Sequence, residues 1–198
     1  MTHTDLSDED LLVQAGAGDR RAAAVLVRRH SNRVMAVAAR MLNNQAEAED
    51  VTQEVFLRTW RMADKWKTGQ AKLTTWMHTV TVNLCIDRLR KPKFANSDDV
   101  PEMSDTSATP AQNVEREEQA KQVRNALSKL PDRQRAAVIL CYFQECTNIE
   151  AAKILKVSVD ALESLLARGR RGLKAHLTDA GIELLGEAPA GRSSGFVG

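Results

Sequence analysis

The sequence predicts an all-α protein with two small helical domains joined by a flexible linker. Apolar residues recur at spacings of three and four rather than two, and aromatic residues make up only 4% of the chain. A segment rich in Pro, Ser, Thr and Asp separates two stretches with this helical pattern. We therefore expect a first domain over residues 1–91, an acidic linker over 92–114, a second domain over 115–178 and a disordered tail over 179–198.

Length and charge narrow the class of protein. The chain has 198 residues and a net charge of +2, with two mildly basic blocks on either side of the acidic linker. No apolar run approaches the roughly 18 residues of a membrane span, and the N-terminus is acidic where a secretory signal would be basic. We expect a cytoplasmic protein without membrane insertion.

The spacing of the cysteines argues against a metal site, and the motif content of the sequence argues against an enzyme. Cys85, Cys141 and Cys146 lack zinc-type spacing and lie in apolar helical patterns, so they are interpreted as reduced, mostly buried thiols. A redox-sensing pair of Cys141 and Cys146 remains the alternative. The sequence has no nucleophile elbow and no glycine-rich phosphate loop, and we expect neither catalysis nor a cofactor.

The first long helix is expected to begin after Asp19, which can cap it, and to end at Asn43-Asn44. Its periodicity predicts one inward-facing stripe. That stripe comprises Ala23, Leu26, Val27, His30, Val34, Val37 and Met41.

A second helix follows at once and has two distinct faces. The inward stripe comprises Ala48, Val51, Val55, Thr59 and Met62. The opposite, polar face comprises Asp50, Gln53, Glu54, Leu57 and Arg61. The leucine in this polar face indicates either contact with a partner or a solvated surface with one stray apolar residue.

A third helix is expected over residues 72–91, with Leu73, Met77, Val80, Leu84 and Cys85 facing inward. Trp66 precedes it, between Lys65 and Lys67. An aromatic ring flanked by cations suits the stacking of an unpaired nucleic-acid base, whereas the alternative is a core tryptophan that closes a loop.

The second domain carries the most informative local pattern. A helix near 115–130 ends at Leu130-Pro131, and another follows over 132–145. Thr147 and Glu150 then fit a capping box, Lys156-Val157 fit a turn, and Ser158 can cap a final helix. The inner face of that final helix comprises Leu162, Leu166, Gly169, Leu173 and Leu177. This pattern predicts a helix-turn-helix, although Lys156 stands where glycine is usual, and a helical hairpin without a DNA role remains possible.

In a helix-turn-helix the second helix enters the major groove of DNA. The residues placed to meet the groove are Asp160, Ala161, Glu163, Ser164, Ala167 and Arg168, and those placed on phosphates are Arg168, Arg170, Arg171 and Lys174. Glu163 can accept a hydrogen bond from cytosine but repels phosphates, which predicts weak binding by the helix alone.

The order of these segments resembles the extracytoplasmic-function (ECF) sigma factors of bacteria. The resemblance rests on AEDVTQEVFLRTWR, TTWMHTVTVNLCIDRLRK, the acidic linker, LPDRQRAAVILCYFQE and the helix-turn-helix, and it covers roughly residues 8–178. It implies a first domain that binds polymerase and the promoter −10 element and a second domain that binds the −35 element. The chain departs from the family at Glu163 and Leu165, where members often carry Lys or Arg.

The resemblance also implies particular roles and partners. The face of Asp50, Gln53, Glu54, Leu57 and Arg61 would dock on the β′ coiled coil of core RNA polymerase, and the second domain would contact the β subunit. Promoter −10 contacts would come from Trp66, Asn83, Arg88 and Lys91, with a flipped base received by Trp66 and Asn83. An anti-sigma factor is expected as a regulator, and the target genes would respond to stress or another signal.

Two other classes of function fit parts of the sequence. A stand-alone helix-turn-helix regulator would explain the second domain, but no heptad or dimerisation helix is evident. A helical adaptor that binds only protein would leave the basic second domain without a role. Core-polymerase pull-down and salt-dependent promoter footprinting would separate these alternatives.

Overall fold

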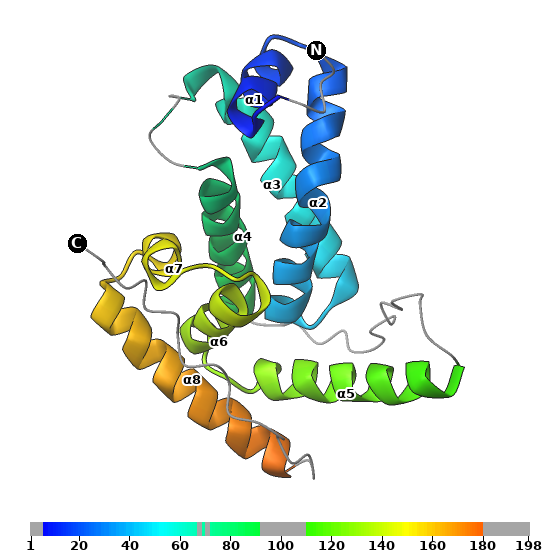
Figure 1. Ribbon diagram of the computed structural model, residues 1–198, viewed down its shortest axis with the longest axis vertical. Helices are drawn as coiled ribbons and strands as arrows, with labels where there is room; N and C mark the ends of the chain where they lie inside the picture. The colour runs from blue at the N-terminus through cyan, green and yellow to red at the C-terminus, as the bar shows by residue number, and fades with distance from the viewer. Residues whose placement is uncertain (1–5, 67–68, 70–71, 92–109, 180–198) are drawn as a thin grey trace, which may run out of the picture.

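The computed structural model describes residues 6–66, 69, 72–91 and 110–179, with side chains in the last range described from residue 118. Within these ranges every regular element is helical, which confirms the predicted all-α class (Figure 1). Linker residues 92–109 and tail residues 180–198 lie outside the described residues.

The first unit is a bundle of four α-helices. These are α1 (Asp8–Gly16), α2 (Arg20–Leu42), α3 (Gln45–Met62) and α4 (Leu73–Arg90), with the short 3₁₀ turn η2 (Ala63–Lys65) after α3. The sequence reasoning missed α1. Its signal was present, because Ser7 caps it by accepting from the backbone N–H of Asp10 at 3.1 Å.

Local capping explains the start of α2 and its junction with α3. The Asp19 carboxylate accepts hydrogen bonds from two backbone N–H groups of the first turn, as predicted. Asn43 takes the left-handed conformation, with φ 51°, and Asn44 caps α3. The prediction is wrong for one inward residue. Val27 is 38% exposed, because it lies at the edge of the apolar stripe rather than at its centre.

Helix α4 is buried on a wider face than its sequence indicated. Leu73, Met77 and Cys85 are buried as expected, but Val80 and Leu84 are only half-buried. The other buried residues of α4 are His78, Thr81 and Val82. The physical reason is that α4 packs against α2 and α3 on one side and against helices of the second unit on another (Figure 1).

The second unit contains α5 (Pro110–Ser128), α6 (Asp132–Val138), α7 (Asn148–Leu155) and α8 (Val159–Asp179). Helix α5 begins at Pro110, earlier than the predicted start near residue 115, so the predicted linker boundary at 114 falls inside this helix. The predicted single helix over 132–145 is also interrupted. After Val138 it continues as one π turn, Ile139–Phe143, in which the Gln144 N–H donates to the Ile139 carbonyl at 3.1 Å.

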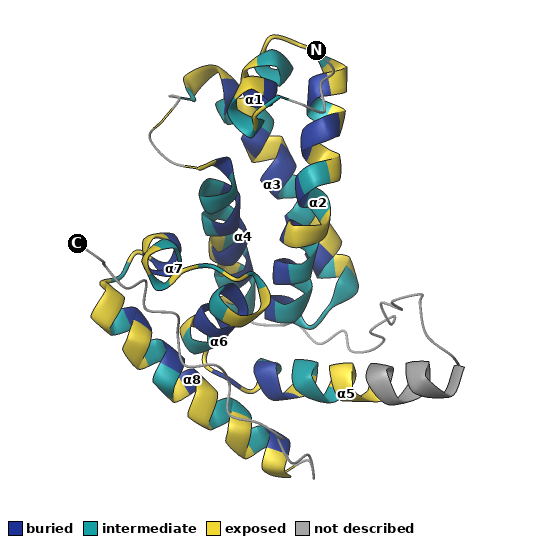
Figure 2. Cartoon of the chain, viewed as in Figure 1, coloured by how far each residue is buried: buried dark blue, intermediate teal, exposed yellow. Residues whose placement is uncertain are grey.

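The two units pack directly against each other, and their buried residues form one continuous core (Figure 2). The centre of the contact is Arg135 of α6, whose side chain is only 5% exposed. Its guanidinium donates to the Met41 carbonyl at the end of α2 and to the Ser128 and Leu130 carbonyls of its own unit. Burial lowers the pKa of Arg135, but three carbonyl oxygens compensate the charged form.

Two polar contacts lie at the edges of this inter-unit contact. Lys72, just before α4, forms an ion pair with Glu150 of α7 at 3.0 Å. The Arg40 guanidinium lies 4.8 Å from the centroid of the Phe143 ring, which the π turn places against α2. The two DNA-binding domains predicted from the sequence therefore contact each other in this structure.

Candidate polymerase and nucleic-acid interfaces

The polar face of α3 is solvent-facing and carries an exposed leucine. The helix buries Val51 and Val55 against α2, which turns the predicted polymerase face outward. Leu57 is 48% exposed in the middle of this face. The face comprises Asp50, Gln53, Glu54, Leu57 and Arg61, of which only Glu54 is half-buried and the others are exposed.

Glu54 has an intrahelical partner that sequence reasoning did not name. Arg58, one turn further on, donates to the Glu54 carboxylate at 2.7 Å. This hydrogen bond is the main cause that lowers the pKa of Glu54. The pair favours the ionised Glu54 carboxylate beside Leu57, and the spacing of four residues was the available signal.

Arg88 connects α4 to α3. Its guanidinium donates to the Glu47 carbonyl at 2.6 Å and lies 4.0 Å from the Asp50 carboxylate. Arg88, predicted to contact the −10 element, thus lies beside Asp50, predicted to bind polymerase. In this conformation the Arg88 side chain is partly engaged within the protein, whereas Asn83 on the same helix and Lys91 directly after it are exposed.

Trp66 directly follows η2 and begins the segment that leads to α4. Its backbone N–H donates to the Ala63 carbonyl at 3.2 Å, and its half-buried ring packs against the core of the first unit. The indole N–H is enclosed without a hydrogen-bond partner in the described part of the chain. Lys65 is exposed, and Lys67 lies outside the described residues.

Trp66 and Asn83 occupy different heights of the bundle. Trp66 precedes α4, and Asn83 lies ten residues after the first residue of that helix. At 1.5 Å per residue, this places Asn83 about 15 Å along the axis from Leu73. Asn83 therefore lies near the middle of α4, away from the end that Trp66 precedes.

The helix-turn-helix of α7 and α8 has the predicted local geometry. The Thr147 hydroxyl accepts from the Glu150 N–H at 3.2 Å, and the Glu150 carboxylate accepts from the Thr147 N–H at 3.2 Å. Lys156 adopts the left-handed conformation, with φ 53° and ψ 52°, although it is not glycine. Ser158 caps α8 by accepting from the Ala161 N–H at 3.2 Å.

The outward face of α8 presents the predicted groove residues. Asp160, Ala161, Glu163, Ser164, Ala167, Arg168 and Arg171 lie on it, the two alanines half-buried and the others exposed. The Asn148 side-chain amide donates to Glu163 at 3.4 Å, so α7 orients this carboxylate. Sequence reasoning missed Asn148 as a support for Glu163.

The inner face of α8 makes a close helix contact. Leu162, Leu166, Gly169 and Leu177 are buried as predicted, and Leu173 is half-buried. A Cβ atom added at Gly169 would lie 2.8 Å from Val138 Cγ2, which shows how closely α8 approaches α6. This contact fixes the direction in which the outward residues point.

The three cysteines are free thiols. Burial raises the pKa of Cys85 to about 12 and that of Cys141 and Cys146 to about 11. At neutral pH all three are therefore protonated, and the reactive thiolate that redox sensing needs is disfavoured. Cys146 Sγ lies 4.0 Å from His78 Nδ1, across the contact between the two units.

A helix-turn-helix on the second of two helical units is typical of a DNA-binding protein. In the comparisons with known families, Sigma-70 region 2 matches residues 26–94 and Sigma-70 region 4 matches residues 120–173. Among the described residues, no helix has the length and apolar character needed to cross a membrane.

Curated relatives cover most of the chain. It is 31% identical over 177 residues to the ECF RNA polymerase sigma factor SigW of Bacillus subtilis, covering 84% of this chain and 94% of that protein. It is 34% identical over 170 residues to SigM of Mycobacterium tuberculosis, covering 84% and 83%. The chain belongs to the ECF RNA polymerase sigma factors and directs transcription initiation by RNA polymerase, to which it binds together with promoter DNA. This membership confirms the expectation of a transcription factor rather than an enzyme.

Solved structures agree with the fold. CnrH in complex with the cytosolic domain of CnrY matches with a TM-score of 0.64 and 28% identity, covering 87% of this chain and 97% of that chain. The sigma factor RpoE in complex with the anti-sigma factor NepR from Bartonella quintana matches with a TM-score of 0.62 and 20% identity, covering 77% and 94%. The latter likeness concerns the fold alone.

Proposed function

We propose that α3 docks on the β′ coiled coil of core polymerase, that the first unit reads and melts the promoter −10 element, and that α8 reads the −35 element. The observation that carries the docking assignment is Leu57, which is 48% exposed between charged side chains. An apolar side chain gains desolvation free energy when a partner buries it, and the polar residues around it would form the rim of the interface. Glu54, which accepts from Arg58, supplies a negative charge beside it.

The −10 assignment is supported by exposed Asn83 on α4, by exposed Lys91 directly after it, and by Trp66 in the segment before it. The −35 assignment is supported by the exposed polar residues of α8 and by the geometry of the turn before it. Contact of the second unit with the β subunit completes the proposed complex. We place this activity in the cytoplasm, where bacterial transcription takes place.

Regulation by an anti-sigma factor belongs to the same proposal. The solved structure of RpoE, which shares this fold, is a complex with an anti-sigma factor, and CnrH was solved with the cytosolic domain of CnrY. An inhibitor that covers the α3 face or the contact between the two units would prevent polymerase binding. The target genes are expected to respond to stress or another signal.

Competition for core polymerase tests the docking assignment. The double variant Glu54→Lys/Leu57→Ala removes one oriented charge and one apolar anchor, and should weaken core binding by about 2 to 4 kcal/mol. This corresponds to roughly 30- to 1000-fold in Kd. A matched control, Val27→Ala/Asp87→Lys, truncates an exposed apolar residue and reverses a charge outside α3. If both double variants compete as well as the unmodified chain, α3 is not the docking face.

A further inference from the structure

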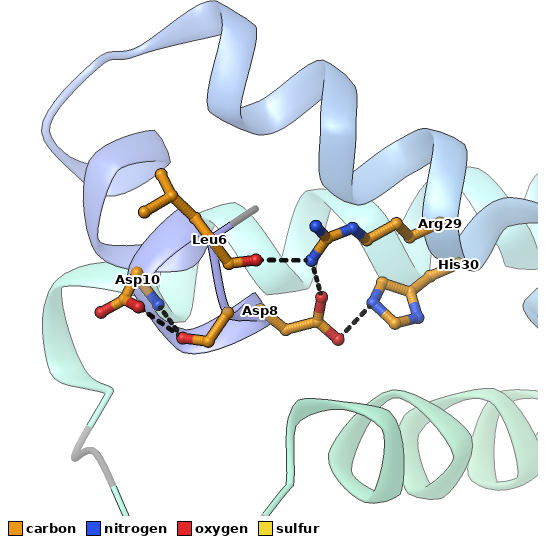
Figure 3. Close-up of polar contacts among 6 residues, drawn as sticks. Leu6, Asp8, Asp10, Arg29 and His30 are labelled. Atoms are coloured by element: carbon orange, nitrogen blue, oxygen red, sulfur yellow. Dashed lines mark hydrogen bonds and ion pairs between the residues drawn. The ribbon is translucent and has the colours of Figure 1, made fainter. Parts of the chain in front are cut away.

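Polar contacts in a partly buried cluster attach helix α1 to α2 (Figure 3). The Asp8 carboxylate lies 2.8 Å from Arg29 Nη1 and 2.7 Å from His30 Nε2, and Arg29 Nη1 also donates to the Leu6 carbonyl at 2.9 Å. His30 is buried, so this contact lies at the edge of the core rather than on the open surface. Leu11 and Leu12 are fully buried. Helix α1 is therefore a rigidly held part of the fold.

The C-terminal end of α1 presses against the turn that leads to Trp66. A Cβ atom added at Gly16 would lie 2.9 Å from Ala63 Cβ and 3.1 Å from Asp64 Oδ1. Real Cβ atoms do not approach other carbons that closely, and Ala63 is buried and has no flexible side chain to move aside. Glycine at position 16 thus permits the contact between α1 and η2.

The N-terminal turn of α1 reaches the same segment beyond Trp66. The Glu9 carboxylate accepts a hydrogen bond from the Gly69 backbone N–H at 3.3 Å. Trp66 lies between this contact and the Gly16–Ala63 contact in the sequence. Its own backbone N–H is bonded to the Ala63 carbonyl, so a displacement of Ala63 acts directly on Trp66.

We propose that α1 is the positioning element for Trp66, with Gly16 and Glu9 as the positioning residues that set its place for the −10 base. This inference rests on the proposed role of Trp66 in −10 recognition. Neither residue contacts DNA in the proposal. They act through Ala63 and Gly69, which lie three residues before and three residues after Trp66.

The size of the expected effect follows from the geometry. Gly16→Ala requires Ala63 to move by several tenths of an ångström or more, since ordinary contacts between carbons begin near 3.5 Å. Misplacement of a reacting or stacking group by about 1 Å can reduce a rate by about 100-fold. We expect Gly16→Ala to lower the rate of open-complex formation by about tenfold, through base capture rather than polymerase binding.

A rescue experiment separates positioning from simple destabilisation. Gly16→Ala, Ala63→Gly and the double variant Gly16→Ala/Ala63→Gly are compared, because the double variant restores room for the added methyl group. Val13→Ala, at an exposed position of α1, is the control. The assay uses full-length protein with core polymerase on a promoter selected by the unmodified chain, and records permanganate reactivity of the −10 bases, core affinity and the melting temperature of the free protein.

The proposal requires that Gly16→Ala loses −10 reactivity at unchanged core affinity and that the double variant regains it. Glu9→Ala should show the same defect in a milder form. Unchanged reactivity in Gly16→Ala overturns the proposal, as does a defect that follows the melting temperature and is not regained by the double variant.

Trp66→Ala in the same assay separates this inference from the proposed function. If Trp66→Ala loses −10 reactivity while Gly16→Ala does not, only the positioning role is overturned. If Trp66→Ala reacts normally, the −10 role of Trp66 and the positioning role are both wrong.

Discussion

Gly169 lies where α8 packs closely against α6, and replacing it with alanine tests that packing. The added Cβ would lie 2.8 Å from Val138 Cγ2 and 3.2 Å from the Gln134 backbone oxygen. Val138 is buried and β-branched, so its side chain has little rotational freedom to move aside. The backbone oxygen can move only with α6 itself.

Two opposing effects set the change in the free energy of unfolding. Alanine in place of glycine stabilises a helix interior by roughly 0.5 to 1 kcal/mol, whereas overpacking a core typically costs about 1 to 3 kcal/mol. We expect Gly169→Ala to lower the free energy of unfolding by about 1 to 2 kcal/mol. Urea unfolding of the full chain, followed by circular dichroism, measures the change.

Gly172 provides a matched control on the same helix. A Cβ atom added there would lie 2.7 Å from Leu130 Cδ2, the end of a side chain that can change rotamer. Gly172→Ala should therefore be neutral or stabilising by up to about 1 kcal/mol. Equal stability of the two alanine variants would refute the packing argument, because it would show that α8 does not need the close contact at Gly169.

Three other outcomes are expected. Asn83→Ala should leave core binding intact and reduce −10 permanganate reactivity by about 2- to 10-fold if it hydrogen-bonds an unstacked base, since a hydrogen bond contributes about 0.5 to 1.5 kcal/mol; normal reactivity would remove Asn83 from the −10 surface. Glu163→Arg should steepen the salt dependence of DNA binding by the second unit by roughly one phosphate contact and shift one −35 position from cytosine towards guanine. A −35 library that returns an unchanged sequence preference would exclude base contact by Glu163. Burial lowers the pKa of His78 from 6.5 to about 4, so the neutral ring is favoured in the folded state. Stability from this group is full above about pH 6.5 and should fall by about 3 kcal/mol towards pH 4, measured by urea unfolding against pH, and His78→Gln should flatten the profile.

The helical class and most of the buried stripes could be predicted because each depends on local spacing. Asp19, Asn43 and Thr147 terminate or begin helices through their own side chains and backbone, and the sequence alone identified all three. Lys156 adopts the left-handed conformation against its intrinsic preference, and the hydrogen bonds of the turn hold it there. In that case the surrounding helices decide the backbone conformation.

Contacts between distant segments could not be predicted in the same way. The burial of His78 and the bridging role of Arg135 depend on the packing of one unit against the other, which periodicity does not encode. Similarly, the sequence predicts an exposed cation at Arg88, but its partners Glu47 and Asp50 lie on α3, about 40 residues earlier. Helix α1 was not predicted for a different reason, because its acidic first turn was considered only as an argument against a secretory signal.

The contact between the two units sets a condition on how far apart the DNA elements can lie. Lys72 of the first unit pairs with Glu150 of the second at 3.0 Å, and Arg135 of the second unit donates to the Met41 carbonyl of the first. Residues 92–109, if fully extended, would span at most about 65 Å. DNA elements farther apart than the packed units can reach would require α7 to leave α4 and Arg135 to leave the Met41 carbonyl. The free energy of that separation would then reduce the apparent promoter affinity of the free chain, and a surface that holds the units apart would increase affinity without touching DNA.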